Sequence, residues 1–245
     1  VEDTITLDNI GDKVYFKALV SNERMATTDS DYHNFVMTGK IAAYGNLNSL
    51  LEEDKETAYT MSLEGKMYCY KNMFKDCTAL IKAPNLPATT LYYNCYESMF
   101  DNCTSLTQAP ALPATTLANN YYSSMFHSCP SLTQAPALPA TTLADYCYYG
   151  MFNGCASLAK APSVLPATTL ASNCYQGMFT GCANLTQTPA LPTTTLAENS
   201  YKSLFAGRPS LTQTPDLYST TPASKCYYNM FPRYTTLTTS RTMLT

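Results

Sequence analysis

The chain has 245 residues, of which 13% are charged and 45% are hydrophobic, and its net charge is −3. This length suffices for one large domain or two small ones. A chain without basic excess is not expected to bind nucleic acid, and no apolar run reaches the ~18 residues of a transmembrane helix. Only two histidines, His33 and His127, are present, which leaves little room for histidine-based metal or acid–base chemistry.

The charge is concentrated at the N-terminal end. Residues 1–72 hold twelve acidic and seven basic side chains, whereas residues 73–245 hold six and eight. Neutral polar residues dominate the second region, which favours neutral ligands or protein partners that bind without strong electrostatic steering. Because no basic and then apolar leader follows Val1, we expect that any signal peptide has been removed or never existed.

Short alternating segments open the chain. Residues 4–7 and 14–19 alternate between apolar and polar, and Gly11-Asp12 lies between them. This pattern predicts a small antiparallel hairpin, and residues 46–56 are expected to form a short helix. We therefore predict that residues 1–65 form a β-rich N-terminal cap, with a small independent module as the alternative.

From residue 66 onward, one sequence unit recurs about every 26 residues. A Met-Phe pair marks each unit, with Leu204-Phe205 in its place once, and one interval is longer because Val164 is inserted. The pairs stand at residues 73–74, 99–100, 125–126, 151–152, 178–179, 204–205 and 230–231. A period of this length predicts about seven stacked units over residues 66–245, which bury their apolar faces against their neighbours.

The first half of each unit has the pattern of a short helix. Thr142 and Asp145 have the spacing of a capping box, as do Thr195 and Glu198. The apolar residues that follow fall within an arc of about 140° on a helical wheel; they are Cys147, Tyr148, Met151, Phe152 and Cys155. The helix should end two residues after each Phe, where the chain has residues that tolerate a left-handed conformation; they are Asp76, Asn102, Ser128, Gly154, Gly181 and Gly207.

The second half of each unit predicts a short strand. Leu132, Ala135 and Leu138 can point inward, while a recurring proline, such as Pro136, lacks the N–H that a long ladder needs. We expect three or four ladder residues per unit, which form a narrow parallel sheet opposite the helices. Leu237 lies 26 residues after Leu211, so one more strand is predicted there. The first strand of such an array needs a cover, which is the role expected of the cap.

The ten cysteines occupy two repeat positions, eight residues apart. The first holds Cys69, Cys95, Cys147, Cys174 and Cys226, and the second holds Cys77, Cys103, Cys129, Cys155 and Cys182. If the two positions of a unit formed a disulfide, a unit that lacks one cysteine should lack the other. The unit of Cys129, however, has Tyr121 at the first position, and the unit of Cys226 has Tyr234 at the second. Residues eight apart in a helix are also about 12 Å apart, beyond disulfide reach. We therefore predict buried thiols that act as small apolar residues, and no metal site because no C-x2-C pair exists.

Two further ladders recur along the array. A tyrosine follows the first cysteine position in every unit, at residues 70, 96, 122, 148, 175, 201 and 227. It could form an exposed platform for sugars, but packing between units with the hydroxyl at the edge is the favoured interpretation. Polar side chains form the second ladder, which alternation turns toward solvent, either as a ligand surface or for solubility alone; they are Lys82, Gln108, Gln134, Lys160, Gln187 and Gln213.

The unit Leu-x3-Cys-Tyr-x2-Met-Phe-x2-Cys-x2-Leu-x2-Ala-Pro-x-Leu-Pro resembles the BspA-like class of bacterial leucine-rich repeats. Met178-Phe179, Cys182, Leu185 and Pro192 occupy the family's apolar-Phe, Cys, Leu and Pro places, and residues 35–46 are similar to the lead-in before such arrays. The unit here is a few residues longer, and proline interrupts its strand. The resemblance implies an α/β fold, a right-handed leucine-rich-repeat solenoid with an N-terminal β-rich cap.

The same resemblance implies an exported protein, at the bacterial cell surface or extracellular, that adheres to host proteins or glycans. The alternative is a structural or assembly element of the cell surface. No nucleophile–His–acid set, phosphate loop or zinc motif occurs, so we predict no enzyme, no catalytic residue, no cofactor and no metal. The expected partner is a protein or carbohydrate, with no nucleic acid and no transmembrane segment, and the chain is expected to be a monomer unless its ends associate.

Overall fold

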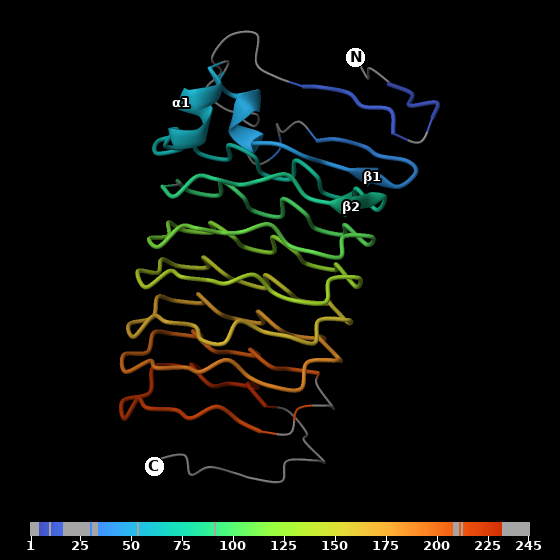
Figure 1. Cartoon of the computed structure of the whole chain (residues 1–245). Helices are drawn as coiled ribbons and strands as arrows, with labels where there is room; N and C mark the ends of the chain where they lie inside the picture. The colour runs from blue at the N-terminus through green and yellow to red at the C-terminus, as the bar shows by residue number, and fades with distance from the viewer. Residues whose placement is uncertain are drawn as a thin grey trace.

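A computed structural model describes residues 5–9, 11–16, 30, 34–52, 54–90, 92–207, 211 and 213–231. In this part the chain winds into coils that stack on one another (Figure 1). Its regular elements are β1 (Ile41–Ala42), the 3-10 helix η1 (Leu47–Leu50), α1 (Lys55–Thr60) and β2 (Leu80–Lys82). The strand predicted around Leu237 and the end of the predicted hairpin lie outside the described residues.

One side of every coil is a ribbon of consecutive turns, which we call the turn ribbon: residues 68–77 in the first coil and their repeats. Three residues per ribbon, spaced four apart, have left-handed backbone, as Tyr68, Asn72 and Asp76 do in the first coil. Asn, Ser and Gly fill most of these places in later coils, and of these Gly and Asn accept this conformation at the lowest steric cost.

The backbone hydrogen bonds of the ribbon alternate between two directions. Lys71 N–H donates to Tyr68 O at 3.0 Å and so closes a turn within the coil. Tyr70 N–H donates to Cys95 O of the next coil, also at 3.0 Å. This alternation continues along the ribbon, so its peptide groups are satisfied without helix or sheet.

The helix predicted in each repeat is therefore wrong for the described units. A left-handed residue at every fourth place cannot belong to a right-handed helix. Thr142, expected to cap that helix, instead pairs with Thr116 in a parallel bridge between coils. The predicted left-handed residue two places after each Phe is confirmed at all six described positions, from Asp76 to Gly207.

The opposite part of each coil supplies the short ladders. β1 and β2 pair in parallel, and isolated parallel bridges such as Gln134 to Lys160 join later coils. β2 has the three ladder residues that were predicted before the proline, but the later coils have isolated bridges instead of three or four ladder residues each. Among the described residues the sheet has only two strands, so the continuous narrow sheet that was expected is not formed.

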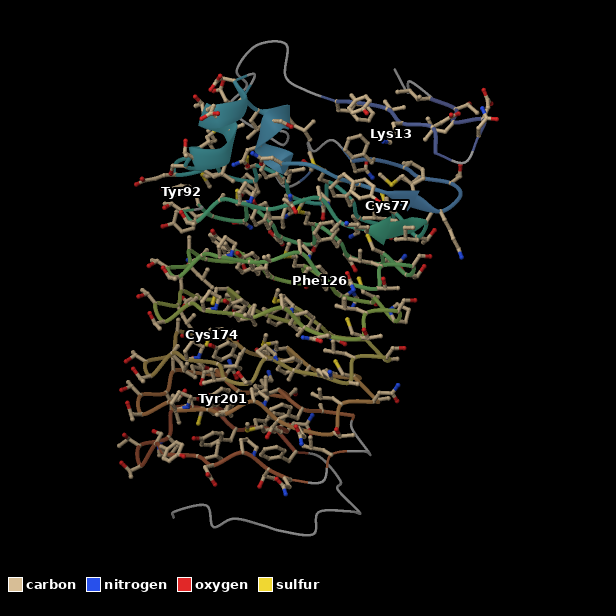
Figure 2. All side chains as sticks on the ribbon, in the orientation of Figure 1. Lys13, Cys77, Tyr92, Phe126, Cys174 and Tyr201 are labelled. Atoms are coloured by element: carbon tan, nitrogen blue, oxygen red, sulfur yellow. The ribbon has the colours of Figure 1, made fainter. Side chains whose placement is uncertain are left out.

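Two columns of aromatic side chains fill the inside of the stack (Figure 2). Phenylalanines from Phe74 to Phe231 stack at 5.4 to 6.0 Å between ring centroids, and tyrosines from Tyr70 to Tyr227 at 5.6 to 6.1 Å. Packing of the tyrosines between units is thus confirmed. Their hydroxyls do not reach an edge, however: that of Tyr148 is buried, and burial raises its pKa.

All ten cysteines are buried thiols, as predicted. Those of the second position donate to the carbonyl of the Phe in the preceding coil, for example Cys103 Sγ to Phe74 O at 3.0 Å. Burial raises the pKa of the Cys174 thiol to about 12, so this group is protonated and chemically inert at neutral pH. The cysteines therefore act as part of the core.

In the described part of the N-terminal cap, residues 34–52 and 54–65 continue the core of the stack. Phe35 stacks on Phe74 at 5.3 Å, and Ile41 pairs with Leu80, 39 residues later instead of the usual 26. The 13 additional residues lengthen the segment that contains η1 and α1, so the single helix predicted over residues 46–56 is replaced by two short ones. A turn joins Asn9 and Asp12 as expected, but the described residues around it form no strand.

Candidate binding surface

The six residues of the polar ladder are all exposed. Lys82 belongs to β2, which lies at one edge of the stack (Figure 1), and the other five have the equivalent place in later coils. We call this set the Gln/Lys ladder: Lys82, Gln108, Gln134, Lys160, Gln187 and Gln213. Each comes two residues after a buried leucine of its coil, Leu80 in the first coil. Their predicted exposure is confirmed, but the residues do not alternate: in β2 the order is buried, exposed, exposed, so Lys82 is exposed although it lies two residues after Leu80. Successive coils place the six residues in one row.

Backbone pairing sets the spacing of the Gln/Lys ladder. Gln134 and Lys160 face each other in a parallel bridge, and Ala135 N–H donates to Lys160 O at 2.9 Å. Adjacent rungs of such a ladder are about 4.8 Å apart. At the N-terminal end, the Lys82 ammonium lies 4.6 Å from the ring centroid of Tyr44, which limits the freedom of this side chain.

The Gln/Lys ladder is a hydrogen-bonding surface that is uncharged except at Lys82 and Lys160. Four amides offer both donors and acceptors, and two ammonium groups offer donors alone. Neighbouring side chains along the row, such as Thr107, Thr133 and Thr186, are exposed and uncharged as well. No three His, Cys, Asp or Glu side chains of the described chain converge in a way that could hold a metal ion.

A second exposed row was missed by the sequence reasoning. Adjacent threonines recur as pairs at residues 89–90, 115–116, 141–142, 168–169 and 194–195, and all ten side chains are exposed. Parallel bridges join Thr116 to Thr142 and Thr169 to Thr195, so these pairs are in register. The recurring Thr-Thr-Leu was a sufficient signal, but its second threonine was interpreted as a helix cap.

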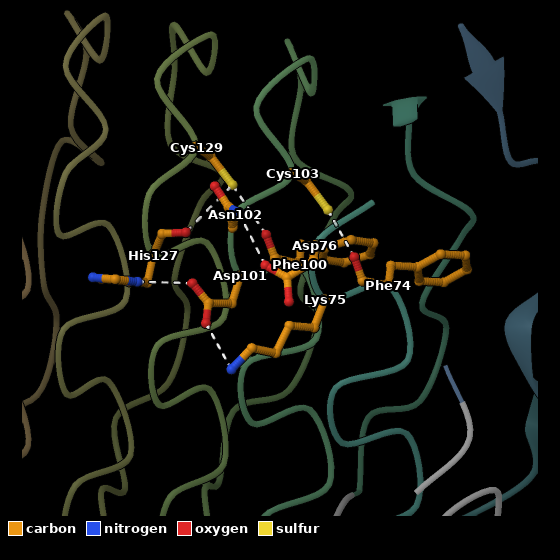
Figure 3. Close-up of polar contacts among 9 residues, drawn as sticks. All are labelled: Phe74, Lys75, Asp76, Phe100, Asp101, Asn102, Cys103, His127 and Cys129. Carbon is orange, nitrogen blue, oxygen red and sulfur yellow. Dashed lines mark hydrogen bonds and ion pairs between the residues drawn. The ribbon is translucent and has the colours of Figure 1, made fainter. Parts of the chain in front are cut away.

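Charged side chains form a small cluster on the turn ribbons of the first three coils (Figure 3). The Asp101 carboxylate lies between Lys75 Nζ at 3.3 Å and His127 Nδ1 at 2.7 Å. Asn102 Nδ2 donates to Asp76 Oδ1 at 2.9 Å beside this group. The cluster links three consecutive coils through side chains.

Mutual charge pairing shifts the two titrating groups of the cluster. Burial alone would raise the pKa of Asp101, but the hydrogen bond and positive charges of His127 and Lys75 lower it. The hydrogen bond that the His127 ring donates to Asp101 raises the pKa of His127, despite partial burial and the nearby Lys75. Because the three groups satisfy one another, the cluster is suited to fastening coils rather than to acid–base chemistry.

Comparison of the chain with protein-family models, with curated proteins and with solved structures finds no significant match. Within the described part of the chain, no helix has the length and apolar character that crossing a membrane requires.

Proposed function

We propose that the chain is a BspA-like leucine-rich-repeat solenoid that binds host proteins or glycans as an exported protein at the bacterial surface. The observation that carries this proposal is the exposed, in-register Gln/Lys ladder, supported by the resemblance of the repeat unit. A stack of coils presents such a row over its whole length, which suits it to extended ligands.

The chemistry of the row supports binding rather than catalysis. Amide side chains pair with the backbone and hydroxyl groups of a ligand through hydrogen bonds, without a requirement for opposite charge. The side chains repeat, so many weak contacts add up over several coils. The buried thiols and tyrosines leave the interior without a group poised for chemistry, and the His127 cluster is already paired.

The direct test is surface plasmon resonance of the purified chain against immobilised host extracellular-matrix proteins and a glycan panel. A triple variant, Gln108→Glu, Gln134→Glu and Gln187→Glu, preserves side-chain size and places three negative charges on the row. We expect its affinity for the bound partner to fall roughly tenfold or more.

A matched control places the same three charges on the other exposed row, as Thr116→Glu, Thr142→Glu and Thr169→Glu. This control should bind within about twofold of the wild type. Equal losses in both triple variants, or no binding to any partner, would contradict the proposal. Concentration-dependent self-association in sedimentation, lost in the ladder variant, would instead favour the alternative of a structural element of the cell surface.

A further inference from the structure

Two tyrosines on the turn ribbon of the fourth coil are exposed, although most repeat tyrosines are in the core. Tyr146 and Tyr149 have 41% and 36% of their surface exposed, whereas Tyr148 between them has 1%. The two exposed rings lie 5.8 Å apart between centroids, with their planes at 56°. They form an open aromatic pair, and the core does not require it.

The pair breaks the repeat at both of its positions. Other coils have Tyr68, Asn94, Asn120, Asn173, Asn199 and Lys225 in place of Tyr146. They have Lys71, Glu97, Ser123, Gln176, Lys202 and Tyr228 in place of Tyr149. Only the fourth coil has an aromatic residue at both positions, so the pair is not a by-product of repeating a packing residue.

The backbone of Tyr146 makes the substitution costly. Its φ of 58° is left-handed, which asparagine tolerates and a bulky side chain does not. The other coils mostly use asparagine at this position, so a more stable residue was available within the repeat. Tyr68 of the first coil has the same conformation, with φ of 57°, but Lys71 follows it three residues later, so the aromatic pair itself distinguishes the fourth coil.

Neutral polar groups border the pair on both sides. The N–H of Gly150 donates to Gln176 O of the fifth coil at 2.9 Å, and that of Ser124 of the third coil donates to Tyr149 O at 2.8 Å. These bonds place Gln176 on one side of Tyr149 and the third coil on the other. Gly150, next to Tyr149, has no side chain, and Gln176 and Asn120 of the neighbouring coils are partly exposed.

We propose that Tyr146 and Tyr149 form a subsite for one pyranose ring of a neutral glycan, with Asn120 and Gln176 as hydrogen-bonding partners of its hydroxyls. A pyranose has an apolar face of C–H groups and a rim of hydroxyls. Aromatic rings suit the first, and amides, which both donate and accept, suit the second.

This subsite deepens the proposed binding function but uses a different part of the molecule. Tyr92 lies at the side of the stack opposite β2 (Figures 1 and 2). Residue 144 is equivalent to Tyr92 in the repeat, and it lies two residues before Tyr146. The aromatic pair and the Gln/Lys ladder can therefore be altered independently.

The test is isothermal titration with neutral hexasaccharides of glucose, mannose, galactose and xylose. The double variant Tyr146→Asn and Tyr149→Ser uses residues that the third coil has at these positions, and it removes the left-handed tyrosine. We expect wild type to bind at least one hexasaccharide, and the variant to bind it roughly tenfold more weakly.

The matched control is Tyr92→Ala and Tyr93→Asn, which removes another contacting tyrosine pair in favour of the second coil's residues, Ala118 and Asn119. It should keep the wild-type affinity. Failure of every hexasaccharide to bind, an unchanged affinity in the Tyr146/Tyr149 variant, or an equal loss in the control would overturn the inference. The triple Glu variant of the Gln/Lys ladder should keep its sugar affinity, which separates this result from failure of the ladder.

Discussion

The interior and the turn-ribbon surface of the stack follow different rules. In the interior, phenylalanine and tyrosine recur in coil after coil, and their columns run without interruption from Phe74 to Phe231 and from Tyr70 to Tyr227. On the ribbon surface, side chains change from one coil to the next, from the charged cluster around Asp101 to the exposed tyrosine at residue 149. A repeat multiplies its packing residues, so residues that serve binding are best sought where the repeat is broken.

The largest effect is expected for removal of an interior ring. Phe126 is fully buried between Phe100 and Phe152, so Phe126→Ala should lower the free energy of unfolding by about 3–5 kcal/mol. Gln134→Ala, on the exposed ladder, should change it by less than about 0.5 kcal/mol. Urea unfolding followed by tyrosine fluorescence measures both, and similar losses in the two variants would show that the columns are not the source of stability.

A smaller loss of stability is expected when the hydrogen-bond partner of one interior hydroxyl is removed. Thr193 Oγ1 is hydrogen-bonded to the Tyr201 hydroxyl, and it donates to Ala167 O at 3.1 Å. Thr193→Ala leaves the Tyr201 hydroxyl without this partner and should cost about 1–3 kcal/mol. The measurement is again the urea midpoint at an unchanged slope.

The converse substitution sharpens the same point. Ala167 and Tyr175 occupy the positions that Thr193 and Tyr201 have one coil later. The hydroxyl of Tyr175 is buried and has no hydrogen-bond partner among the described residues. Ala167→Thr supplies the equivalent hydroxyl and should raise stability by about 1 kcal/mol. A loss of stability in this variant would mean that the interior has no room for the added atoms.

The sequence predicted the interior well because the ribbon and a helix bury the same residues. Inward positions at offsets 0, 1, 4, 5 and 8, as in residues 147–155, satisfy both a period of about 3.6 and a period of four. The distinguishing signal was the row of residues that tolerate left-handed backbone, such as Asn173, Gly177 and Gly181. Of the three such residues in each ribbon, only the last was predicted to be left-handed, so the turn ribbon itself was not predicted.

The candidate site was predicted in part for a similar reason. The inward Ala135 next to Gln134 was enough to predict that Gln134 is exposed, although Thr133 before it is exposed as well, so the stretch does not alternate as a regular strand does. Exposure of Tyr146 depends instead on the ribbon conformation, which turns its side chain away from the core while Tyr148 points inward. Composition and periodicity do not reveal that difference.

On the turn ribbon, the left-handed backbone favours glycine over residues that have a Cβ. Gly154 has φ of 80°, and a Cβ there would lie 3.3 Å from Ser128 Oγ of the preceding coil. Gly154→Ala should cost about 1–2 kcal/mol from left-handed strain, with the close contact adding to it. Ser128→Gly relieves the same strain in the third coil but loosens the unfolded chain, so it should be nearly neutral. Differential scanning calorimetry of the pair tests this, and equal effects of opposite sign would argue against it.

The smallest effect concerns the charged cluster and depends on pH. The pKa of His127 is raised, so its pairing with Asp101 stabilises the fold fully below about pH 6.5 and is lost as pH rises through the folded pKa. The pKa of Asp101 is lowered, so its contribution is present above about pH 4 and is lost as pH falls through the folded pKa. The cluster should therefore contribute most between about pH 4 and 6.5.

The variant His127→Asn isolates this term, because Asn153 occupies the same place in the next coil. His127 is partly exposed, and solvent screens its charge, so the variant should lose at most about 1 kcal/mol at pH 5.5. At pH 8.5 the neutral imidazole contributes little charge pairing, and the two proteins should unfold at nearly the same urea concentration. Added salt should shrink the difference at pH 5.5 as well, since it screens exposed charges. A difference in stability that persists at pH 8.5 and in high salt would show that His127 acts through packing. This part of the ribbon surface would then stabilise the fold by packing, as the interior does.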